Sequence, residues 1–322
     1  VCVGHKLFNS FFAYFQKKTW VYKANNCFRI QSLIFSMRNC ILIILCLIGS
    51  KSVHGTASNS LSDCNTLAAN FYSTCGGSAV TNILSSTGTA VSCSTGFTSL
   101  TCPGTYTSGT CVFYHKLCVT CSGSSTVRIR VQSNGLPRFC PNVPATLREV
   151  NMDFTVNFNP DVNVNYPNHS PTTSSAVISI VCNINNQASV PSGSNYVLNS
   201  GSTQLNTLAG ISIDGVSIFN VNSANNVDPF FPAGGYAVET VDACLGHPSP
   251  SNNAYHYHAA SGCAFTASNS SILSCTSTAA CNSNVATYSV STFSSHNTLT
   301  VIGIAKDGHI IYGPYTSAGV QV

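Results

Sequence analysis

The stretch AGISIDGVSIFNV, residues 209–221, decides the fold class of this 322-residue chain. Two short runs of β-branched and aromatic residues lie on either side of Asp214-Gly215. An Asp-Gly pair between two such runs is a strong short-range signal for a β-hairpin, because both residues tolerate the positive φ of a tight turn. The stretch therefore predicts a strand, a two-residue turn and a second strand.

The same design occurs again near the C-terminus. In TLTVIGIAKDGHIIYGPY, residues 298–315, an apolar run leads into Asp307-Gly308 and a second apolar run follows. We expect a second hairpin there. Between the two hairpins lies a histidine-containing segment bounded by prolines and asparagines, which we place on or beside a strand.

Two further segments have strand patterns, and helix signals are scarce. Apolar side chains alternate with polar ones at Phe154, Val156 and Phe158, and SSAVISIVCNINN at residues 174–186 is a second candidate strand. Ser, Thr, Asn, Gly and β-branched residues dominate over the Lys, Glu and Ala-Leu runs that favour helices. We predict an all-β fold in which residues 146–322 form a β-sandwich-like domain.

Eight cysteines lie close together ahead of that domain: Cys64, Cys75, Cys93, Cys102, Cys111, Cys118, Cys121 and Cys140. We interpret residues 56–145 as a small module held together by disulfides rather than by a core. Cys118 and Cys121 form a CxxC pair, which is found in zinc and redox sites. No second CxxC exists and an exported chain oxidises its thiols, so disulfides are favoured.

Residues 37–55, MRNCILIILCLIGSKSVHG, have the layout of a secretory signal peptide. Arg38 is followed by an apolar run shorter than the roughly 20 residues that a membrane span needs. The alternative is a buried core helix. Residues 1–36 precede the first methionine and contain no acidic residue, so we interpret them as translation of an untranslated region, with a genuine extension as the alternative.

The net charge of the chain changes when residues 1–55 are left out. Seven of the 13 Lys and Arg residues lie before residue 56, whereas all nine Asp and Glu residues lie after it. The mature part therefore carries six basic and nine acidic side chains, and the chain's basic character gives no support for nucleic-acid binding. Two acceptor sequons, at Asn168 and Asn269, agree with a secreted glycoprotein without a membrane span in its mature part.

Three histidines lie within twelve residues, at His247, His256 and His258. Residues two apart on a strand project to the same face, so His256 and His258 are predicted to share one face and Tyr255 and Tyr257 the other. Neutral imidazoles suit Zn or Cu, and three of them with an open position form a familiar catalytic arrangement. The alternative is that the histidines are structural.

Residues near the histidines have more than one possible role. Cys244 is expected in a disulfide, with Cys263 as the candidate partner, rather than on a metal. Asp242 either orients a ligating imidazole or caps a turn. No carboxylate stands out as a general base, and Asp307 is the best candidate.

Three blocks together resemble the signature of the YHYH domain family: ISIDGVSIFN at 211–220, DACLGHPSPSNNAYHYH at 242–258 and VIGIAKDGHIIYGPY at 301–315. The resemblance covers about residues 150–322. It implies a secreted or cell-surface protein but no settled activity. The positions that carry it are Asp242, Gly246, His247, Tyr255, His256, Tyr257, His258, Asp307, Gly308, Tyr312, Gly313 and Tyr315.

The chain departs from the resembled pattern in two ways. His309 stands where the family has an aromatic or apolar residue, and it is either a fourth nitrogen ligand or an exposed turn residue. The family's last block continues beyond Gly-Pro-Tyr, and 13 cysteines, an odd number, follow residue 56. Both observations lead us to expect a truncated C-terminus.

Two functions fit these patterns. The first is a secreted metalloprotein that hydrolyses or oxidises an extracellular substrate, with Zn or Cu on the three histidines and Tyr255, Tyr257 or Asp307 as candidate catalytic residues. The second is an extracellular module that binds glycans or proteins and in which the histidines are structural.

Overall fold

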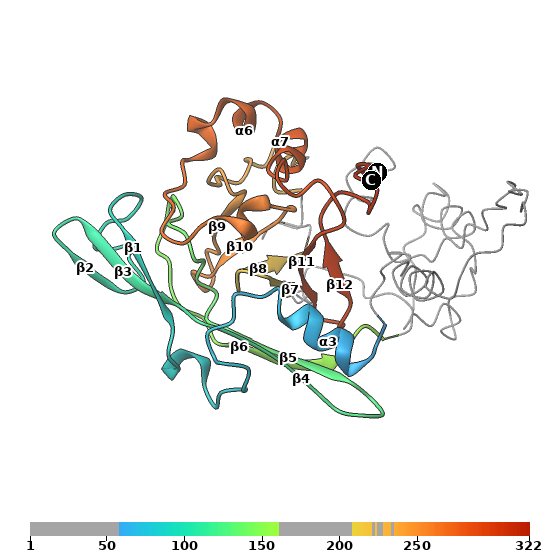
Figure 1. The fold of residues 1–322 in the computed structure, drawn as a ribbon. Coiled ribbons are helices and arrows are strands. Elements are labelled where there is room, and N and C mark those ends of the chain that lie inside the picture. Colours follow the sequence, from blue (N-terminus) through green and yellow to red (C-terminus); the bar gives the residue numbers. More distant parts are fainter. Residues whose placement is uncertain (1–57, 161–207, 221–222, 224–227, 233–234) are drawn as a thin grey trace, which may run out of the picture.

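A computed structural model describes residues 58–160, 208–220, 223, 228–232 and 235–322. Strands outnumber helices in these parts of the chain and form three sheets (Figure 1). The all-β prediction is therefore confirmed. The predicted strand at 174–186, the signal segment and the Asn168 sequon lie outside the described residues.

The strands are short. They are β1 (Thr89–Cys93), β2 (Thr105–Thr107), β3 (Thr110–His115), β4 (Leu117–Ser122), β5 (Arg128–Ser133), β6 (Met152–Asn157), β7 (Leu208–Ser212), β8 (Ser217–Phe219), β9 (Gly246–Pro248), β10 (Tyr255–Tyr257), β11 (Val301–Ala305) and β12 (Ile310–Tyr312). The helices are α3 (Leu61–Ala68), η2 (Ile83–Ser85), η3 (Gly262–Phe265), η4 (Cys275–Ser277), α6 (Ala279–Ser283) and α7 (Val285–Ser291).

Both predicted hairpins are present in the six-stranded sheet, whose order is β12-β11-β7-β8-β10-β9. β7 and β8 pair antiparallel around Gly215, which has a φ of 80°. β11 and β12 pair antiparallel around Gly308, which has a φ of 92°. β10 runs parallel to β8 and antiparallel to β9, so the histidine segment completes one edge of the sheet.

The β4-β5-β6 sheet packs against this six-stranded sheet. β6 alternates half-buried and exposed side chains, as the spacing of Phe154 and Val156 predicts. Val131 of β5 belongs to the same hydrophobic core as Ile211 of β7 and Ile304 of β11. The larger sheet lies between the β4-β5-β6 sheet and helices α6 and α7 (Figure 1).

A second hydrophobic core joins the cysteine-rich segment to the histidine segment. Val91 of β1 and Phe113 of β3 share this core with Ile218, Tyr255 and Tyr257. The cysteine-rich segment thus supplies buried apolar side chains as well as disulfides. Its boundary with the C-terminal domain stays a prediction from composition.

The described residues form six disulfides: Cys64–Cys121, Cys75–Cys118, Cys93–Cys140, Cys102–Cys111, Cys244–Cys263 and Cys275–Cys281. The eight clustered cysteines pair among themselves, and the two CxxC cysteines bond to different partners, so neither is free for zinc or redox exchange. The predicted Cys244–Cys263 bond is confirmed. The thirteenth cysteine after residue 56, Cys182, lies outside the described residues.

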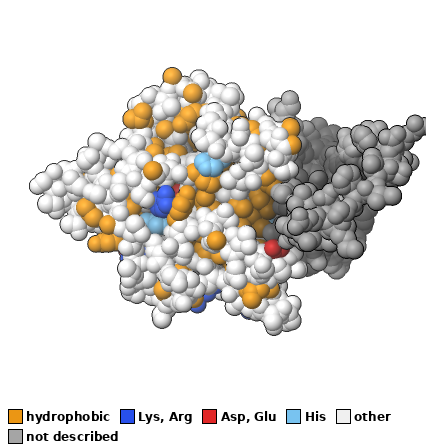
Figure 2. Space-filling model, viewed as in Figure 1, with side chains coloured by type: hydrophobic (Ala, Val, Ile, Leu, Met, Phe, Trp, Pro, Cys, Tyr) orange, Lys and Arg blue, Asp and Glu red, His pale blue; other side chains and the backbone are white. Residues whose placement is uncertain are grey.

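Two surface features are relevant to function. Charged side chains are thinly scattered over the face drawn in Figure 2. Among the described residues, no helix is long and apolar enough to cross a membrane.

Candidate metal centre

Two short paired strands position the three histidines. His247 on β9 and His256 on β10 are direct cross-strand partners, and His258 follows two residues later. Cross-strand partners have neighbouring side chains. The imidazoles of His247 and His256 accordingly lie with ring centroids 4.4 Å apart, and those of His256 and His258 lie 4.7 Å apart.

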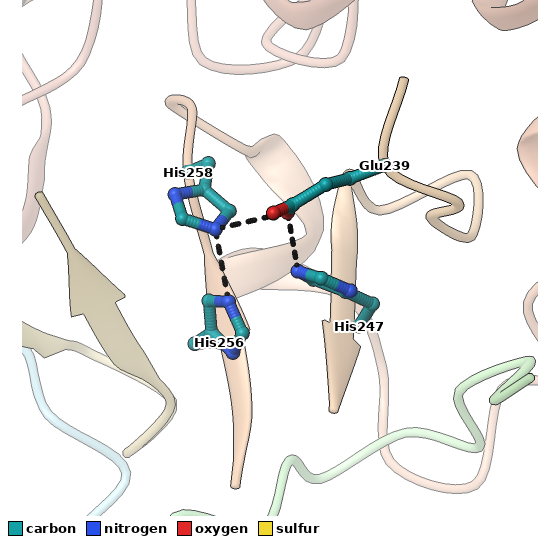
Figure 3. A group of neighbouring side chains, drawn as sticks. All are labelled: Glu239, His247, His256 and His258. Atoms are coloured by element: carbon teal, nitrogen blue, oxygen red, sulfur yellow. Dashed lines mark hydrogen bonds and ion pairs between the residues drawn. The ribbon is translucent and has the colours of Figure 1, made fainter. Parts of the chain in front are cut away.

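A carboxylate joins the histidines from the irregular segment that precedes β9. Glu239 Oε2 lies 2.9 Å from His247 Nε2 and 3.3 Å from His258 Nε2, while the Nε2 atoms of His256 and His258 lie 3.0 Å apart (Figure 3). One ligand atom from each residue falls within 4.8 Å of all the others. The structure therefore brings the three predicted histidines together and adds Glu239.

The outer nitrogens of two of these rings have backbone partners. His256 Nδ1 lies 3.0 Å from the carbonyl oxygen of Ala254, and His258 Nδ1 lies 3.0 Å from that of Asn220. A carbonyl only accepts, so each Nδ1 must carry a proton. In the neutral rings the lone pairs are then on Nε2, and both point into the cluster. This arrangement is typical of histidines that bind a metal, whose other nitrogen is held by a carbonyl or carboxylate.

The polar atoms inside the cluster are poorly satisfied by one another. Glu239 Oε2 and His247 Nε2 are buried and close together, yet neither has a hydrogen bond of acceptable alignment. Buried polar atoms without partners are rare in native proteins. In a tetrahedral Zn site with bonds of about 2.0–2.1 Å, neighbouring ligand atoms lie about 3.3 Å apart. The three measured separations are close to that value, so the residues fit a divalent ion.

Burial and the neighbouring charges set the protonation of the cluster. Burial by itself raises the pKa of Glu239, but the contacts with His247 and His258 outweigh it and lower the pKa below its usual range. Burial, together with the neighbouring His247 and His258, lowers the pKa of His256 to about 2. The cluster therefore contains a charged carboxylate and a neutral His256 imidazole at physiological pH, which are the forms that bind metals.

Phe219 closes one side of the cluster. Its ring stacks on His256 with centroids 3.9 Å apart and meets His258 edge to face. A surface hollow of about 300 Å³ lies elsewhere, beside Leu100, Pro103 and Arg148, and none of the four candidate ligands lines it. The converging ligand atoms of the cluster therefore lie outside this hollow.

The tyrosines of the motif occupy the opposite face of β10, as the alternation predicts. The Tyr255 hydroxyl donates to both carboxylate oxygens of Asp242, at 3.0 and 2.8 Å, and the Tyr257 hydroxyl donates to Asp214 Oδ2 at 3.0 Å. Both aspartates and both tyrosines are buried. The tyrosines therefore tie β10 to the turn before β9 and to the β7–β8 hairpin turn.

Asp242 contacts the turn before β9. It accepts hydrogen bonds from the backbone amides of Cys244 and Gly246 in addition to the Tyr255 hydroxyl. Of the two roles considered from sequence, these contacts match the cap of a turn. Gly246 is required there because the Tyr255 ring fills the space where a Cβ atom would stand.

Three other predicted positions lie apart from the cluster. Asp307 is exposed in the β11–β12 turn and forms an ion pair with His309 at 3.1 Å, and His309 Nε2 contacts the carbonyl oxygen of Pro160. Neither belongs to the group of four converging ligand atoms. Asn269 is exposed, and its side-chain oxygen accepts from the Ser92 amide.

Glu239 was missed by sequence reasoning. It lies eight residues before His247 and has no fixed spacing to the His-x-His pair, so no pattern marks it. One signal was available: the chain has only nine acidic residues, and two of them, Glu239 and Asp242, lie within the eight residues before the first histidine of the cluster.

Comparison with known proteins gives one match. Residues 187–321 match the sequence model of a family described as YHYH protein. No curated protein and no solved structure shows significant similarity to the chain. The resemblance to the YHYH family that the sequence blocks predict is therefore confirmed over residues 187–321.

Proposed function

We propose that this protein is a secreted metalloprotein that holds one divalent ion, Zn or Cu, through His247, His256, His258 and Glu239. The observation that carries the proposal is the pair of Nε2 lone pairs of His256 and His258, which face each other 3.0 Å apart. Two buried lone pairs repel each other unless a cation or a proton lies between them. Imidazole nitrogen with a single carboxylate is a donor set that suits both metals.

Secretion is supported by the covalent framework. Twelve cysteines form six disulfides, which persist in oxidising compartments and are rare in the cytosol. The apolar segment at residues 37–55 fits an export signal. We propose that the protein acts outside the cell, with Asn269 as a glycosylation site.

The reaction that fits this site is hydrolysis or oxidation of an extracellular substrate. A bound ion supplies Lewis acidity and lowers the pKa of a bound water. Among the chain's own residues, His256 and His258 orient their lone pairs through their Nδ1 contacts, and Glu239 contributes the negative charge. Phe219 covers the His256 ring and excludes water from that side.

A structural metal in a glycan-binding or protein-binding module is the second candidate. Burial favours it, because the whole residues His256 and His258, backbone included, are only 2% and 9% exposed and four protein ligands fill a tetrahedral shell. Both candidates require the metal, and they differ in whether a ligand from solution can reach it.

Metal analysis of the secreted, tag-free chain tests the proposal. We expect about one Zn or Cu per chain by mass spectrometry of the elements, and loss of that metal in His256→Ala and His258→Ala. His296→Ala is the matched control, because His296 stacks on Phe265 and is not one of the four converging residues. The proposal would be refuted if folded wild-type protein stayed metal-free after incubation with Zn and also after incubation with Cu.

A further inference from the structure

The four candidate ligands are not held equally firmly. His247 and His256 are partners in a strand pair, and His256 and His258 each have an Nδ1 hydrogen bond to a backbone carbonyl. The paired backbone restrains His247 and His256, and a held outer nitrogen restrains His256 and His258, so each of these residues is limited in moving away from a common point.

Glu239 is attached differently. It lies outside any helix or strand, and its backbone amide donates to the Pro229 carbonyl at 2.8 Å. Its side chain is 19% exposed, compared with 11% for His247 and 3% for His258. Its Oε2 atom lies 2.9 Å from His247 and 3.3 Å from His258 but has no well-aligned hydrogen bond among the described residues, whereas carbonyls hold the outer nitrogens of His256 and His258.

The chain around Glu239 is open to solvent. Tyr236 and Val238 are 50% and 57% exposed, and Thr240 on the other side is exposed as well. Phe219 covers the cluster from the His256 side. The ligand atoms of Glu239 and His247 are themselves buried, so a molecule in solution reaches them when Glu239 moves out, on the side where its chain neighbours are exposed.

We infer that Glu239 is the exchangeable ligand of this site and that a carboxylate group of a soluble molecule takes its place. The inference rests on the proposed metal centre and assigns its substrate class. Three neutral imidazoles leave the double positive charge of the ion uncompensated when Glu239 withdraws, so an anionic oxygen donor is the ligand that restores the charge balance. A carboxylate matches the group that it replaces in charge, size and donor atom.

Cobalt(II) in the secreted full chain provides the readout, because its visible spectrum reports changes in coordination. Wild type, Glu239→Ala and Glu239→Gln are loaded with one equivalent of Co²⁺ and titrated with acetate. Asp307→Asn is the control, because Asp307 is exposed, acidic and not among the converging ligands. Binding of Co²⁺ itself is measured first, so that a failure of the metal centre is recognised before acetate is added.

We expect all four proteins to bind Co²⁺ and acetate to change each spectrum. An intramolecular carboxylate competes at an effective concentration on the order of millimolar or above, so both Glu239 variants should respond at about tenfold lower acetate than wild type and Asp307→Asn. Unchanged spectra with acetate in all four Co²⁺ proteins would overturn the inference and leave the metal centre standing. Loss of Co²⁺ from both Glu239 variants would also overturn it, because Glu239 would then be an indispensable ligand. Wild type that binds no Co²⁺ would overturn the proposed function and the inference together.

Discussion

The Nε2 atoms of His256 and His258 lie 3.0 Å apart, and neither carries a proton when both Nδ1 atoms donate to backbone carbonyls. The β-strand places both rings on one face, and the hydrogen bonds to the two carbonyls determine that each imidazole carries its proton on Nδ1. A cation between the two Nε2 atoms would relieve the repulsion between their lone pairs. Tyr-His-Tyr-His is thus a strand with two different faces: its histidines offer lone pairs, and its tyrosines anchor the strand to buried aspartates.

Metal content should fall on acidification. Imidazole ligands bind as neutral rings and protonate near pH 6.5 when unperturbed, so affinity decreases as the pH falls below about 6. Glu239 keeps its charge over this range because its contacts with His247 and His258 lower its pKa. Dialysis at pH 7.5 and pH 5, followed by elemental analysis, should show metal only at the higher pH. Retention of a full equivalent at pH 5 by folded protein would argue against histidine ligation.

The tyrosines should matter for stability rather than for metal binding. Tyr255→Phe removes the hydroxyl that donates to Asp242 and leaves a buried carboxylate short of one donor. Loss of a partner from a buried polar group costs about 1–3 kcal/mol, so the urea midpoint should decrease while metal stoichiometry is unchanged. Tyr114→Phe is the control, because Tyr114 is 51% exposed. Metal loss in Tyr255→Phe at full stability would instead place Tyr255 on the ion.

Some features of the fold and of the candidate site could be predicted from the sequence, and others could not. The Asp214-Gly215 and Asp307-Gly308 hairpins were predicted because their signals are local: two residues with special backbone freedom between apolar runs. The shared face of His256 and His258 followed from strand geometry. Such features depend on neighbours in the chain, and short-range rules describe them well.

The remaining features of the site depend on the three-dimensional path of the chain, which brings separate segments into contact. Glu239 approaches the histidines only because the turn held by Asp242 leads into β9, and no fixed spacing encodes that path. The tyrosine partners Asp242 and Asp214 come from separate elements for the same reason. The cysteine-rich segment packs on the histidine strand through a shared core, which composition alone did not indicate.

Gly246 should tolerate no side chain. A Cβ atom there meets the Tyr255 ring, and that ring is fixed by Asp242 and by the surrounding core. Overpacking of a rigid core costs about 1–3 kcal/mol, so Gly246→Ala should lower the thermal midpoint. The control is Ala90→Gly on an exposed strand position, which shows the effect of changing one methyl group alone. Gly109→Ala is unsuitable as a control because the φ of Gly109 is positive. Equal stability of Gly246→Ala and wild type would contradict the packing described for Tyr255.

Asn269 should carry a glycan when the chain is secreted from a eukaryotic host. The residue is exposed, and its contact with the Ser92 amide uses the side-chain oxygen and leaves the nitrogen for attachment. Asn269→Gln and Ser271→Ala both destroy the sequon, and the second keeps Asn269 in place. Both variants should run at the same apparent mass on a gel, below that of wild type. Enzymatic removal of all N-glycans, including any at Asn168, should abolish the difference in mobility. Identical mobility of wild type and both variants would show that Asn269 is unmodified.

Asp242 should contribute a decrease in the stability of the metal-free protein as the pH rises from about 4 to 7, whereas His256, whose pKa burial lowers to about 2, contributes an increase over much of the same range. Burial raises the pKa of Asp242 to about 7, against the lowering effect of the Tyr255 hydroxyl and the surrounding amides. The unfolded chain releases this proton near pH 3.8, whereas the folded chain keeps it until about pH 7. Between these values the folded state binds more protons, so each rise in pH favours unfolding, and the slope flattens above the folded pKa.

Asp242→Asn is uncharged at every pH, so the loss of stability that this carboxyl causes in wild type between pH 4 and pH 8, on the order of a few kcal/mol, should be absent from the variant. The slope should not vanish, because burial also raises the pKa of Asp214 and adds a contribution of the same sign. Asp153→Asn is the control without a slope change: Arg130 lowers the pKa of Asp153, so this carboxyl is ionised in both the folded and the unfolded chain above about pH 4 and its loss leaves the slope unchanged. Urea unfolding with chelator at several pH values measures all three proteins. A slope in Asp242→Asn as steep as in wild type would show that the Asp242 carboxyl is already ionised in the folded protein at low pH, held there by the hydroxyl and amides that donate to it.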